Sequence, residues 1–317
     1  MKAKKIIIAG GSGFLGQSLK RYLVARGMQI ITLTRNPGYE DEILWDGQHL
    51  GAWCEELEEA LAVINLCGKS VDCRYTQKNK DLILQSRIAP TTILNEAIKL
   101  AKIKPQVFIN ASSATVYIHA ENEQMTERAG ILGDDFSMNV VKAWEAAFFK
   151  EDIAEVRKIA LRTSIVLGAE GGAWPQLKKI IKLGLGGQQG SGNQKVSWIH
   201  ELDFCRSIEH IITCKALEGP VNITAPKPIS NKDFMQHLRD VIQPLFYLNQ
   251  PKVLLELGAY FLRTETELLL KSRNVVPEKL LKSKFDFEYP NLKSIDLNAL
   301  TKDKEQQQPL MSSYQVI

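Results

Sequence analysis

The 317-residue sequence predicts an α/β fold in which a doubly wound parallel sheet is followed by a smaller C-terminal lobe. Two observations carry this prediction. Strand-like runs that are apolar almost throughout alternate with helical patterns over the first half of the chain, as expected of parallel strands buried on both faces. The first run, residues 6–8, stops at a glycine-rich turn that leads directly into a helical pattern.

The expected elements follow one another in the order strand, helix, strand that builds parallel units. The first such unit is complete within about 30 residues, which is the usual length. The expected ranges are a strand at 6–8, a helix from 14, strands at 28–34, 43–45 and 62–66, helices at 55–61 and 76–101, and a strand at 107–111.

Beyond residue 168 the alternation ends, so we divide the chain there. The sheet domain covers 1–168, with part of 195–225 returning to it, the smaller lobe covers 169–300, and 301–317 is a flexible polar tail without periodicity.

Within the lobe, the glycine-rich stretch Gly184 to Gly192 could be a lid over a crevice or an ordinary solvent hairpin. A strand-like run follows at 195–199. Ser230 and Asp233 have the spacing of a capping box, so a helix is expected to begin there.

The glycine-rich turn, KKIIIAGGSGFLGQS at 4–18, spaces its glycines as Gly10, Gly13 and Gly16. Between a strand and a helix, this spacing allows a tight bend and a close approach of backbone to a diphosphate, which the helix N-terminus attracts. The turn nearly matches the P-loop of ATPases, but Gln17 stands where that loop needs lysine. A dinucleotide site is therefore expected, and an ATPase is not.

The end of the second strand indicates which dinucleotide. An NAD site usually has Asp or Glu there to accept bonds from ribose hydroxyls, but this chain has Thr34-Arg35. The planar guanidinium of Arg35 suits a phosphate on the ribose, so we expect NADP(H) to be preferred over NAD(H). The alternative is that Arg35 is a solvated side chain at the start of a loop.

Composition excludes several classes of function. The net charge of +4 is mild and its lysines are scattered, so nucleic acid is not an expected partner. The N-terminal apolar run is too short for a signal peptide, and no run approaches the ~18 apolar residues of a membrane helix. Five cysteines without a C-x-x-C pair fit a reducing cytoplasm. The five histidines form no ligand pattern, so no metal is expected.

Ligands on parallel sheets bind at the carboxyl ends of the strands. The turn from Gly10 to Gly16, Thr34-Arg35, Leu66 to Gly68 and Ser112-Ser113 all follow strands. We therefore expect them to converge on one crevice.

Several ordered motifs resemble a known family. They are GxxGxxG at the N-terminus, NLCG (65–68), SRIAPT (86–91), NASSATVY (110–117), KAWEAA (142–147), LRTSIVLG (161–168), GGAWPQL (171–177), LGLGGQQGSGNQKVSWIHELD (183–203), GPVNITAP (219–226) and LLLKSRNVVPEKL (268–280). Over residues 4–300 the chain resembles the extended, atypical short-chain dehydrogenases/reductases, in the sugar-nucleotide-epimerase-like subfamily of the NAD-dependent epimerase/dehydratase family, whose substrates are undefined. The resemblance implies a Rossmann fold.

The resemblance also implies binding residues. Those implied for the cofactor are Gly10, Ser12, Gly13, Phe14, Leu15, Gly16, Thr34, Arg35, Leu66, Cys67, Gly68, Arg87, Ala111, Ser112 and Lys142. Those considered for the substrate are His200, Asp203 and Arg206, with Arg263 and Arg273 as further candidates for a substrate phosphate. The helices at 76–101 and 137–150 could form a homodimer contact, as in relatives.

In the broad family a Ser, a Tyr and a Lys carry the chemistry. Tyrosine exchanges a proton as hydride moves, lysine binds ribose hydroxyls and lowers the pKa of the tyrosine, and serine holds the substrate oxygen. The pattern assigns Ser113 and Lys142, but Met138 stands where the tyrosine is expected. A thioether has no exchangeable proton, so Met138 is neither acid nor base, and helical spacing makes it a packing residue.

Three hypotheses remain open. In the first, Tyr117 or an ordered water replaces the lost phenol, and the protein is an oxidoreductase or epimerase that acts on a small carbonyl or hydroxyl substrate, for example a nucleotide sugar. In the second, it is a catalytically silent NADP(H)-binding sensor or regulatory protein. In the third, it is a dehydratase or lyase whose acid and base come from elsewhere, with His200 and Asp203 as candidates.

Overall fold

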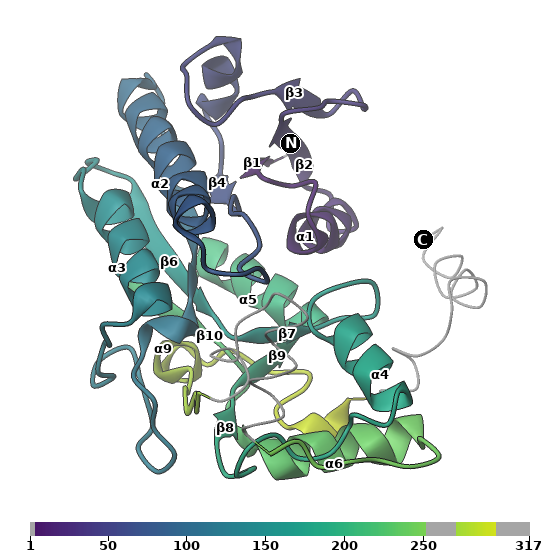
Figure 1. Ribbon diagram of the computed structural model, residues 1–317. Coiled ribbons are helices and arrows are strands. Elements are labelled where there is room, and N and C mark those ends of the chain that lie inside the picture. The colour runs from purple at the N-terminus through teal and green to yellow at the C-terminus, as the bar shows by residue number, and fades with distance from the viewer. Residues whose placement is uncertain (1–3, 252–270, 296–317) are drawn as a thin grey trace.

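A single parallel sheet of seven strands organises the first two thirds of the chain. The structure, a computed structural model, describes residues 4–251 and 271–295. The strand order is β10-β6-β5-β4-β1-β2-β3, and all six pairings are parallel. The predicted α/β fold with a doubly wound parallel sheet is confirmed (Figure 1).

The strands of this sheet are β1 (Lys5–Ala9), β2 (Gln29–Thr34), β3 (Glu42–Leu44), β4 (Ala62–Asn65), β5 (Val107–Ser113), β6 (Arg157–Thr163) and β10 (Gly219–Ile223). The helices that cover it are α1 (Phe14–Val24), α2 (Gln77–Leu100), α3 (Phe136–Phe149) and α5 (Glu201–Thr213). Since β10 pairs with β6, residues 219–223 return to the sheet from beyond the first domain.

Alternating side chains of β1 separate the two layers of helices. Ile6 and Ile8 are fully buried in a cluster with residues of α1 and α5, whereas Ile7 and Ala9 belong to a cluster with residues of α2 and α3. In Figure 1 the two pairs of helices accordingly lie on opposite faces of the sheet. Burial on both faces explains why the strands are apolar without alternation.

The helical segment expected at 55–61 forms differently. A short 3₁₀ helix, η1 (Ala52–Leu57), takes its place and buries Trp53 and Leu57. The chain then adopts a left-handed conformation at Glu59, with φ 58°, before it enters β4. An α-helix cannot pass through that conformation, so the helical turn ends early.

The described residues of the smaller lobe form two short two-stranded sheets and several helices. Their elements are β7 (Ile165–Leu167) with β9 (Trp198–His200), β8 (Lys195–Val196) with β11 (Ile229–Ser230), α4 (Trp174–Lys182) and α6 (Asn231–Ile242), followed by α9 (Glu278–Lys282) and η3 (Leu292–Ser294). Trp174, Trp198 and Phe234 form the centre of its core. The Ser230 side chain accepts a hydrogen bond from the Asp233 N–H at 3.2 Å, which confirms the predicted N-cap of α6.

Three sequence expectations differ from the structure, are defined further by it or lie outside it. The strand expected at 195–199 is broken at Ser197, whose hydroxyl donates to the Arg273 carbonyl at 2.6 Å. The glycine-rich stretch 184–192 packs against residues 248–250 of the lobe through backbone bonds, and the tail at 301–317 lies outside the described residues.

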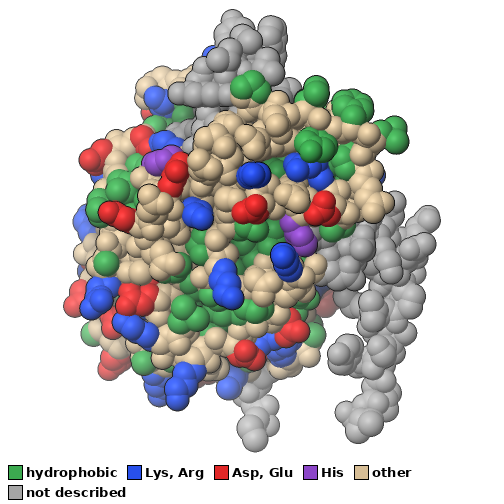
Figure 2. All heavy atoms as spheres, turned by 90° about the horizontal axis from the view of Figure 1, so that it is seen from below, with side chains coloured by type: hydrophobic (Ala, Val, Ile, Leu, Met, Phe, Trp, Pro, Cys, Tyr) green, Lys and Arg blue, Asp and Glu red, His purple; other side chains and the backbone are tan. Residues whose placement is uncertain are grey.

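The face of the molecule in Figure 2 carries acidic and basic side chains interspersed, with hydrophobic patches between them. No basic stripe of the kind that nucleic acid needs stands on this face. Among the described helices, none combines the length and the apolar character required to cross a bilayer.

Candidate functional site

The glycine turn after β1 is built from close backbone contacts. Gly10 has φ +74°, and a Cβ there would lie 3.0 Å from the Cys67 backbone nitrogen. A Cβ on Gly16 would lie 2.5 Å from the Gly11 Cα, so only glycine lets α1 approach the turn this closely. Gly13 is the N-cap of α1 without a side-chain cap, so the first N–H groups of the helix are open to a ligand.

Gln17, at the position where a P-loop has lysine, turns back onto the loop. Its Nε2 donates to the Gly11 carbonyl at 3.1 Å. This amide stabilises the turn and brings no positive charge to a terminal phosphate. The geometry therefore agrees with a dinucleotide turn.

Arg35 is exposed at the end of β2 and makes no ion pair with any described residue. Burial raises the pKa of the Cys67 thiol to about 12, and the Arg35 charge opposes that shift. Since Cys67 contacts Gly10, the guanidinium lies within electrostatic reach of the turn. Thr34, beside it, is buried and accepts from the Asn36 N–H at 3.4 Å.

A pocket of about 250 Å³ opens at the carboxyl ends of β4 and β5. Its walls combine aromatic, aliphatic and hydroxyl side chains with one guanidinium. The lining residues are Leu66, Cys67, Gly68, Val71, Tyr75, Ile83, Arg87, Ser112, Ser113, Thr115, Phe136, Ser137, Val140, Val141 and Trp144. The structure thus brings together five of the residues predicted at two strand ends, Leu66 to Gly68 and Ser112-Ser113, with Arg87.

Arg87 is the cation of this pocket. Its guanidinium lies 5.1 Å from the Trp144 ring centroid and donates to the Ile83 carbonyl at 2.9 Å, and no described carboxylate pairs with it. Burial lowers its pKa to about 10. A Cβ at Gly68 would stand 3.3 Å from the Arg87 Cζ, so glycine leaves the room that the guanidinium occupies. A half-buried cation without a described counter-charge suits an anionic ligand.

Ser113 lines the pocket at the end of β5. Its hydroxyl oxygen accepts hydrogen bonds from the Thr115 N–H at 3.2 Å and the Thr115 hydroxyl at 2.9 Å. The Ser113 proton is left to donate, so the group can bind a carbonyl or alkoxide oxygen in the pocket.

Lys142 and Met138 lie on α3 but do not line this pocket. The Lys142 ammonium pairs with Asp134, whose side chain is exposed to solvent. The Met138 side chain is buried over Gly133, where a Cβ would stand 2.1 Å from its sulfur. The structure gives Met138 a packing role, and the coenzyme role that the resemblance implies for Lys142 stays a prediction.

Tyr117 is fully buried and belongs to a polar network instead of the pocket. Its hydroxyl accepts from Arg162 Nη1 and donates to Asn222 Oδ1, both at 2.9 Å. Arg162 also forms a two-point pair with Glu145 at 2.9 and 2.7 Å. Burial raises the pKa of Tyr117. Both hydrogen-bonding capacities of the phenol are used inside the protein, which is a structural role.

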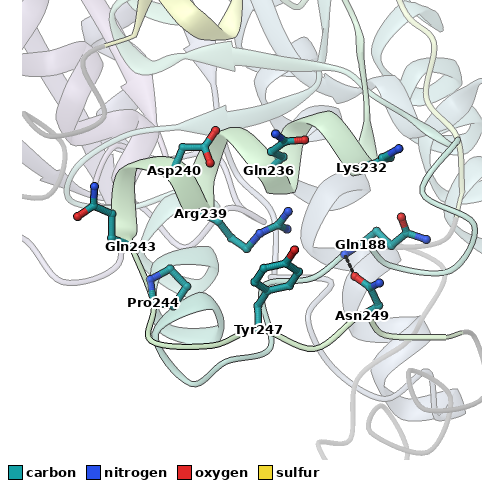
Figure 3. A pocket seen from close by; sticks show the side chains of 9 residues that line it. All are labelled: Gln188, Lys232, Gln236, Arg239, Asp240, Gln243, Pro244, Tyr247 and Asn249. Atoms are coloured by element: carbon teal, nitrogen blue, oxygen red, sulfur yellow. Dashed lines mark hydrogen bonds between the residues drawn. The ribbon is translucent and has the colours of Figure 1, made fainter.

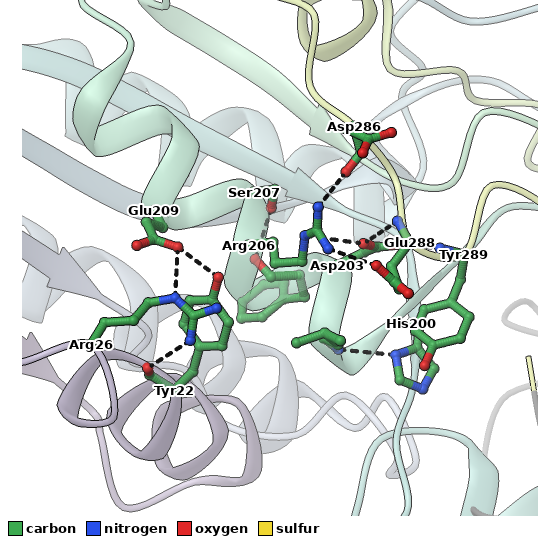
Figure 4. Close-up of polar contacts among 12 residues, drawn as sticks. Tyr22, Arg26, His200, Asp203, Arg206, Ser207, Glu209, Asp286, Glu288 and Tyr289 are labelled. Atoms are coloured by element: carbon green, nitrogen blue, oxygen red, sulfur yellow. Dashed lines mark hydrogen bonds and ion pairs between the residues drawn. The ribbon is translucent and has the colours of Figure 1, made fainter. Parts of the chain in front are cut away.

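His200, Asp203 and Arg206 stand together on α5 and its N-cap, but they hold another segment of the chain (Figure 4). The fully buried Asp203 carboxylate accepts from the backbone N–H groups of Glu288 and Tyr289 at 3.0 and 2.8 Å. Arg206 pairs with Glu288 at 2.8 Å. These contacts join residues 286–289 to α5, so the three residues predicted for substrate have structural partners.

His200 caps α5 through its Nδ1, which accepts from the Leu202 N–H at 3.1 Å. The imidazole stacks on the Tyr289 ring at 3.9 Å between centroids. Burial lowers the pKa of His200 to about 4, so the ring is neutral near pH 7. Among the other phosphate candidates, the backbone N–H of Arg273 donates to the Lys195 carbonyl, and Arg263 lies outside the described residues.

The remaining residues implied for the cofactor surround the turn. The Phe14 ring begins α1 and lies against Gly168, Gly171 and Gly172, where added Cβ atoms would meet it at 2.4, 2.4 and 3.3 Å. Leu15 packs on the core beneath the turn, Ser12 is exposed in it, and Ala111 lies within β5.

The aromatic side chains that line the pocket, Tyr75, Phe136 and Trp144, were not predicted from the sequence. Tyr75 stands in an irregular segment between β4 and α2, where no periodicity reveals the direction of a side chain. The position of Tyr75 in the sequence gave one indication that it lies near the site. It directly precedes Thr76, the N-cap of a helix that begins near the carboxyl end of a strand.

A second pocket, of about 600 Å³, lies in the lobe between α6 and the segments around Gln188 and Tyr247 (Figure 3). Its lining is polar. The Arg239 guanidinium stacks on the Tyr247 ring at 4.1 Å and donates to the Gly186 carbonyl at 2.6 Å. Within the described part of the chain, no group of three His, Cys, Asp or Glu side chains is placed to hold a metal ion.

Comparison with known proteins agrees with this geometry. The model of the NAD-dependent epimerase/dehydratase family matches residues 6–134, and that of a domain of unknown function (DUF1731) matches 250–295. Epimerase family protein YfhF of Bacillus subtilis is 32% identical over 295 residues, covering 90% of this chain and 95% of the relative. Human epimerase family protein SDR39U1 is 28% identical over 291 residues, covering 91% and 97%.

Solved structures extend the comparison. The crystal structure of human SDR39U1 with NADPH has a TM-score of 0.83 and covers 95% of this chain and 99% of its own. A nucleoside-diphosphate sugar epimerase from Corynebacterium glutamicum has a TM-score of 0.75 at 26% identity, with 98% of this chain and 65% of that one covered. The glycine turn, the parallel sheet and these similarities over 90% or more of this chain lead to one conclusion: this chain belongs to the NAD-dependent epimerase/dehydratase family of extended short-chain dehydrogenases/reductases.

Proposed function

We propose that the protein is an NADP(H)-dependent oxidoreductase or epimerase that acts on a small substrate with a carbonyl or hydroxyl group. The observation that carries the proposal is a pair of guanidinium groups without carboxylate partners among the described residues, Arg35 and Arg87, at the two sides of a glycine turn. The NADPH in the crystal structure of human SDR39U1 supports the same coenzyme.

Each group of the site has a place in this proposal. The open N–H groups of α1 bind the diphosphate of the coenzyme, Arg35 binds the phosphate on its ribose, and Arg87 supplies the positive charge of the pocket at the strand ends. Bound nicotinamide supplies or accepts a hydride. Ser113 donates its proton to the substrate oxygen and so orients the carbon that changes its oxidation state. A sugar nucleotide is the substrate class that the Corynebacterium relative suggests.

Arg35→Ala tests the coenzyme assignment. NADPH affinity should fall by about 10- to 100-fold, the usual value of a hydrogen-bonded charge pair, while NADH affinity stays unchanged. Titration of coenzyme fluorescence measures both. Arg128→Ala is the matched control, because this arginine side chain is 83% exposed and lies on another segment. An unchanged ratio of NADPH affinity to NADH affinity in Arg35→Ala would show that Arg35 does not bind the coenzyme.

A catalytically silent NADP(H)-binding protein is the second candidate. It is favoured by the packing of Met138 over Gly133 and by the pairing of Lys142 with Asp134. NADPH oxidation by purified protein, screened with sugar nucleotides and simple carbonyl compounds, separates the two. A rate that Ser113→Ala abolishes would rule the silent protein out. The contacts of the two candidate residues do not favour the lyase hypothesis. His200 caps α5 and Asp203 accepts from a backbone N–H group, so both side chains have structural partners.

A further inference from the structure

The wall that α3 contributes to the strand-end pocket has neither a phenol nor a cation. Its side chains are Phe136, Ser137, Val140, Val141 and Trp144. Met138 is buried over Gly133, and Lys142 pairs with Asp134. In the fold family these two positions would carry the proton-transferring pair.

Two other segments that line the pocket carry a phenol and a cation. Tyr75 lies in the segment between β4 and α2, and Arg87 lies on α2, and both line the pocket together with Ser113. Both pack against α3, Tyr75 on Phe136 and Arg87 on Trp144. Arg87 has no carboxylate partner among the described residues, so its charge is directed to the pocket's contents. The two functional groups that α3 lacks are therefore present on neighbouring segments of the same pocket.

Tyr75 is held in place from both sides. Its ring packs edge-to-face on the Phe136 ring, with 4.7 Å between centroids and an interplanar angle of 63°. The following residue, Thr76, caps α2 by accepting from the Asn79 N–H at 3.3 Å, and Asn79 Nδ2 donates to the Arg74 carbonyl at 2.8 Å. A phenol fixed in this way loses little conformational freedom when a substrate binds.

Tyr75 and Arg87 also interact electrostatically. Burial lowers the pKa of Arg87, and the Tyr75 phenolate opposes that shift. The interaction is reciprocal, so the guanidinium stabilises the ionised phenol. This is the effect that the family lysine has on the family tyrosine.

We propose that Tyr75 is the proton donor and acceptor of this site and that Arg87 stabilises its phenolate, in place of residues 138 and 142. The proposal rests on the proposed function. In the direction of reduction, the Tyr75 O–H bond breaks and its proton forms an O–H bond on the substrate oxygen, while the carbonyl carbon receives the hydride from the coenzyme. Ser113 binds the same oxygen throughout, and the phenolate that remains takes a proton from water that enters the pocket after the product has left.

A nuclear magnetic resonance titration tests the pair without any substrate. Full-length protein is labelled with ¹³C at the Cζ of tyrosine, and Tyr75→Phe and Tyr247→Phe identify two of the signals. Tyr247 is the control, because it lies in the second pocket against Arg239. NADPH should shift the Tyr75 signal and leave that of Tyr247 unchanged. In Arg87→Met the ionisation midpoint of Tyr75 should move to higher pH by about one unit.

A rate measurement tests the role in catalysis. NADPH-linked reduction of 9,10-phenanthrenequinone should fall by about a hundredfold or more in Tyr75→Phe, the usual contribution of a general acid, with NADPH affinity unchanged. Tyr75→Trp serves if Tyr75→Phe fails to fold, since it also removes the phenol and keeps an aromatic ring for Phe136.

The outcomes separate the two proposals. Failure of wild-type protein to bind NADPH would overturn the proposed function and this inference with it. NADPH binding with no shift of the Tyr75 signal, an ionisation midpoint indifferent to Arg87→Met, or a wild-type rate in Tyr75→Phe would overturn the inference alone. If every carbonyl probe stays unreduced by wild-type protein, the catalytic role of Tyr75 is rejected and the silent alternative stands.

Discussion

Arg87 keeps a positive charge inside a pocket without a described carboxylate to balance it. Such a charge costs folding free energy, because desolvation is repaid by a single hydrogen bond to the Ile83 carbonyl and by contact with Trp144. A residue retained at that cost serves a ligand more plausibly than it serves the fold.

Arg87→Met should therefore separate stability from binding. The free energy of unfolding of the ligand-free protein should rise by about 1 kcal/mol, since methionine fills similar space without a charge. NADPH affinity should fall by about 10- to 100-fold. Urea unfolding and fluorescence titration measure the two effects.

Arg157→Met is the matched control for this experiment. Arg157 is also partly buried and forms no ion pair with a described carboxylate, but it donates to the carbonyls of Leu217, Ile211 and Ile212 at 2.7, 2.9 and 3.1 Å. Its loss should destabilise the protein and leave NADPH affinity unchanged. If Arg87→Met behaved like Arg157→Met, Arg87 would be a structural residue.

At the scale of elements, a buried polar chain ties the sheet to α3 and to the lobe. Ser112 of β5 donates to Glu145 of α3 at 2.6 Å, and Glu145 pairs with Arg162 of β6. Arg162 donates to the Tyr117 hydroxyl, which in turn donates to Asn222 of β10. Asn222 then donates to the Val276 carbonyl at 2.9 Å. The chain begins at a residue that lines the pocket, so it fixes the position of that strand end.

Glu145→Gln should break this chain. The Arg162 guanidinium would keep its charge in a site where only 7% of its side chain is exposed, and the free energy of unfolding should fall by about 3 kcal/mol. Urea denaturation measures the change.

Glu151→Gln is the control, because its pair with Lys99 is at the surface and is worth little. A loss in Glu145→Gln no larger than in the control would show that the buried pair contributes no more than a surface pair.

At the scale of the whole molecule, burial of His200 makes the fold sensitive to acid. The pKa of this imidazole is about 4 in the folded chain, against an ordinary value of 6.5. As pH falls, His200 is protonated in the unfolded chain at a higher pH than in the folded chain. Stability from His200 is therefore present above about pH 6.5 and is lost between 6.5 and 4.

His200→Asn should remove this dependence, because asparagine can still cap α5 but does not titrate in this range. Between pH 7 and pH 5 the wild-type protein should lose about 2 kcal/mol more stability than the variant. Comparing the two proteins cancels the opposite effects of Glu127 and Asp203, whose pKa values burial raises. Equal losses would mean that the imidazole stays hydrated in the folded protein.

The sheet and the glycine turn could be predicted because both depend on local sequence. Continuous apolar strands and the spacing of Gly10, Gly13 and Gly16 specify them within a few residues. The direction of long side chains could not be predicted this way. Lys142 turns to Asp134, a partner in the preceding loop, and His200 packs on Tyr289, 89 residues away along the chain, so tertiary contacts decide where each group points.

The contact of Phe14 with the loop at 168–172 has a consequence for engineering. Glycines in such a loop suggest a hinge, yet here they make room for an aromatic ring from the first turn of α1. The lobe therefore packs closely on the first turn of α1, next to the glycine turn. A chimera that grafts this lobe onto another dinucleotide-binding domain would need an aromatic residue at position 14, because a side chain at Gly172 would meet the Val166 carbonyl oxygen at 2.3 Å.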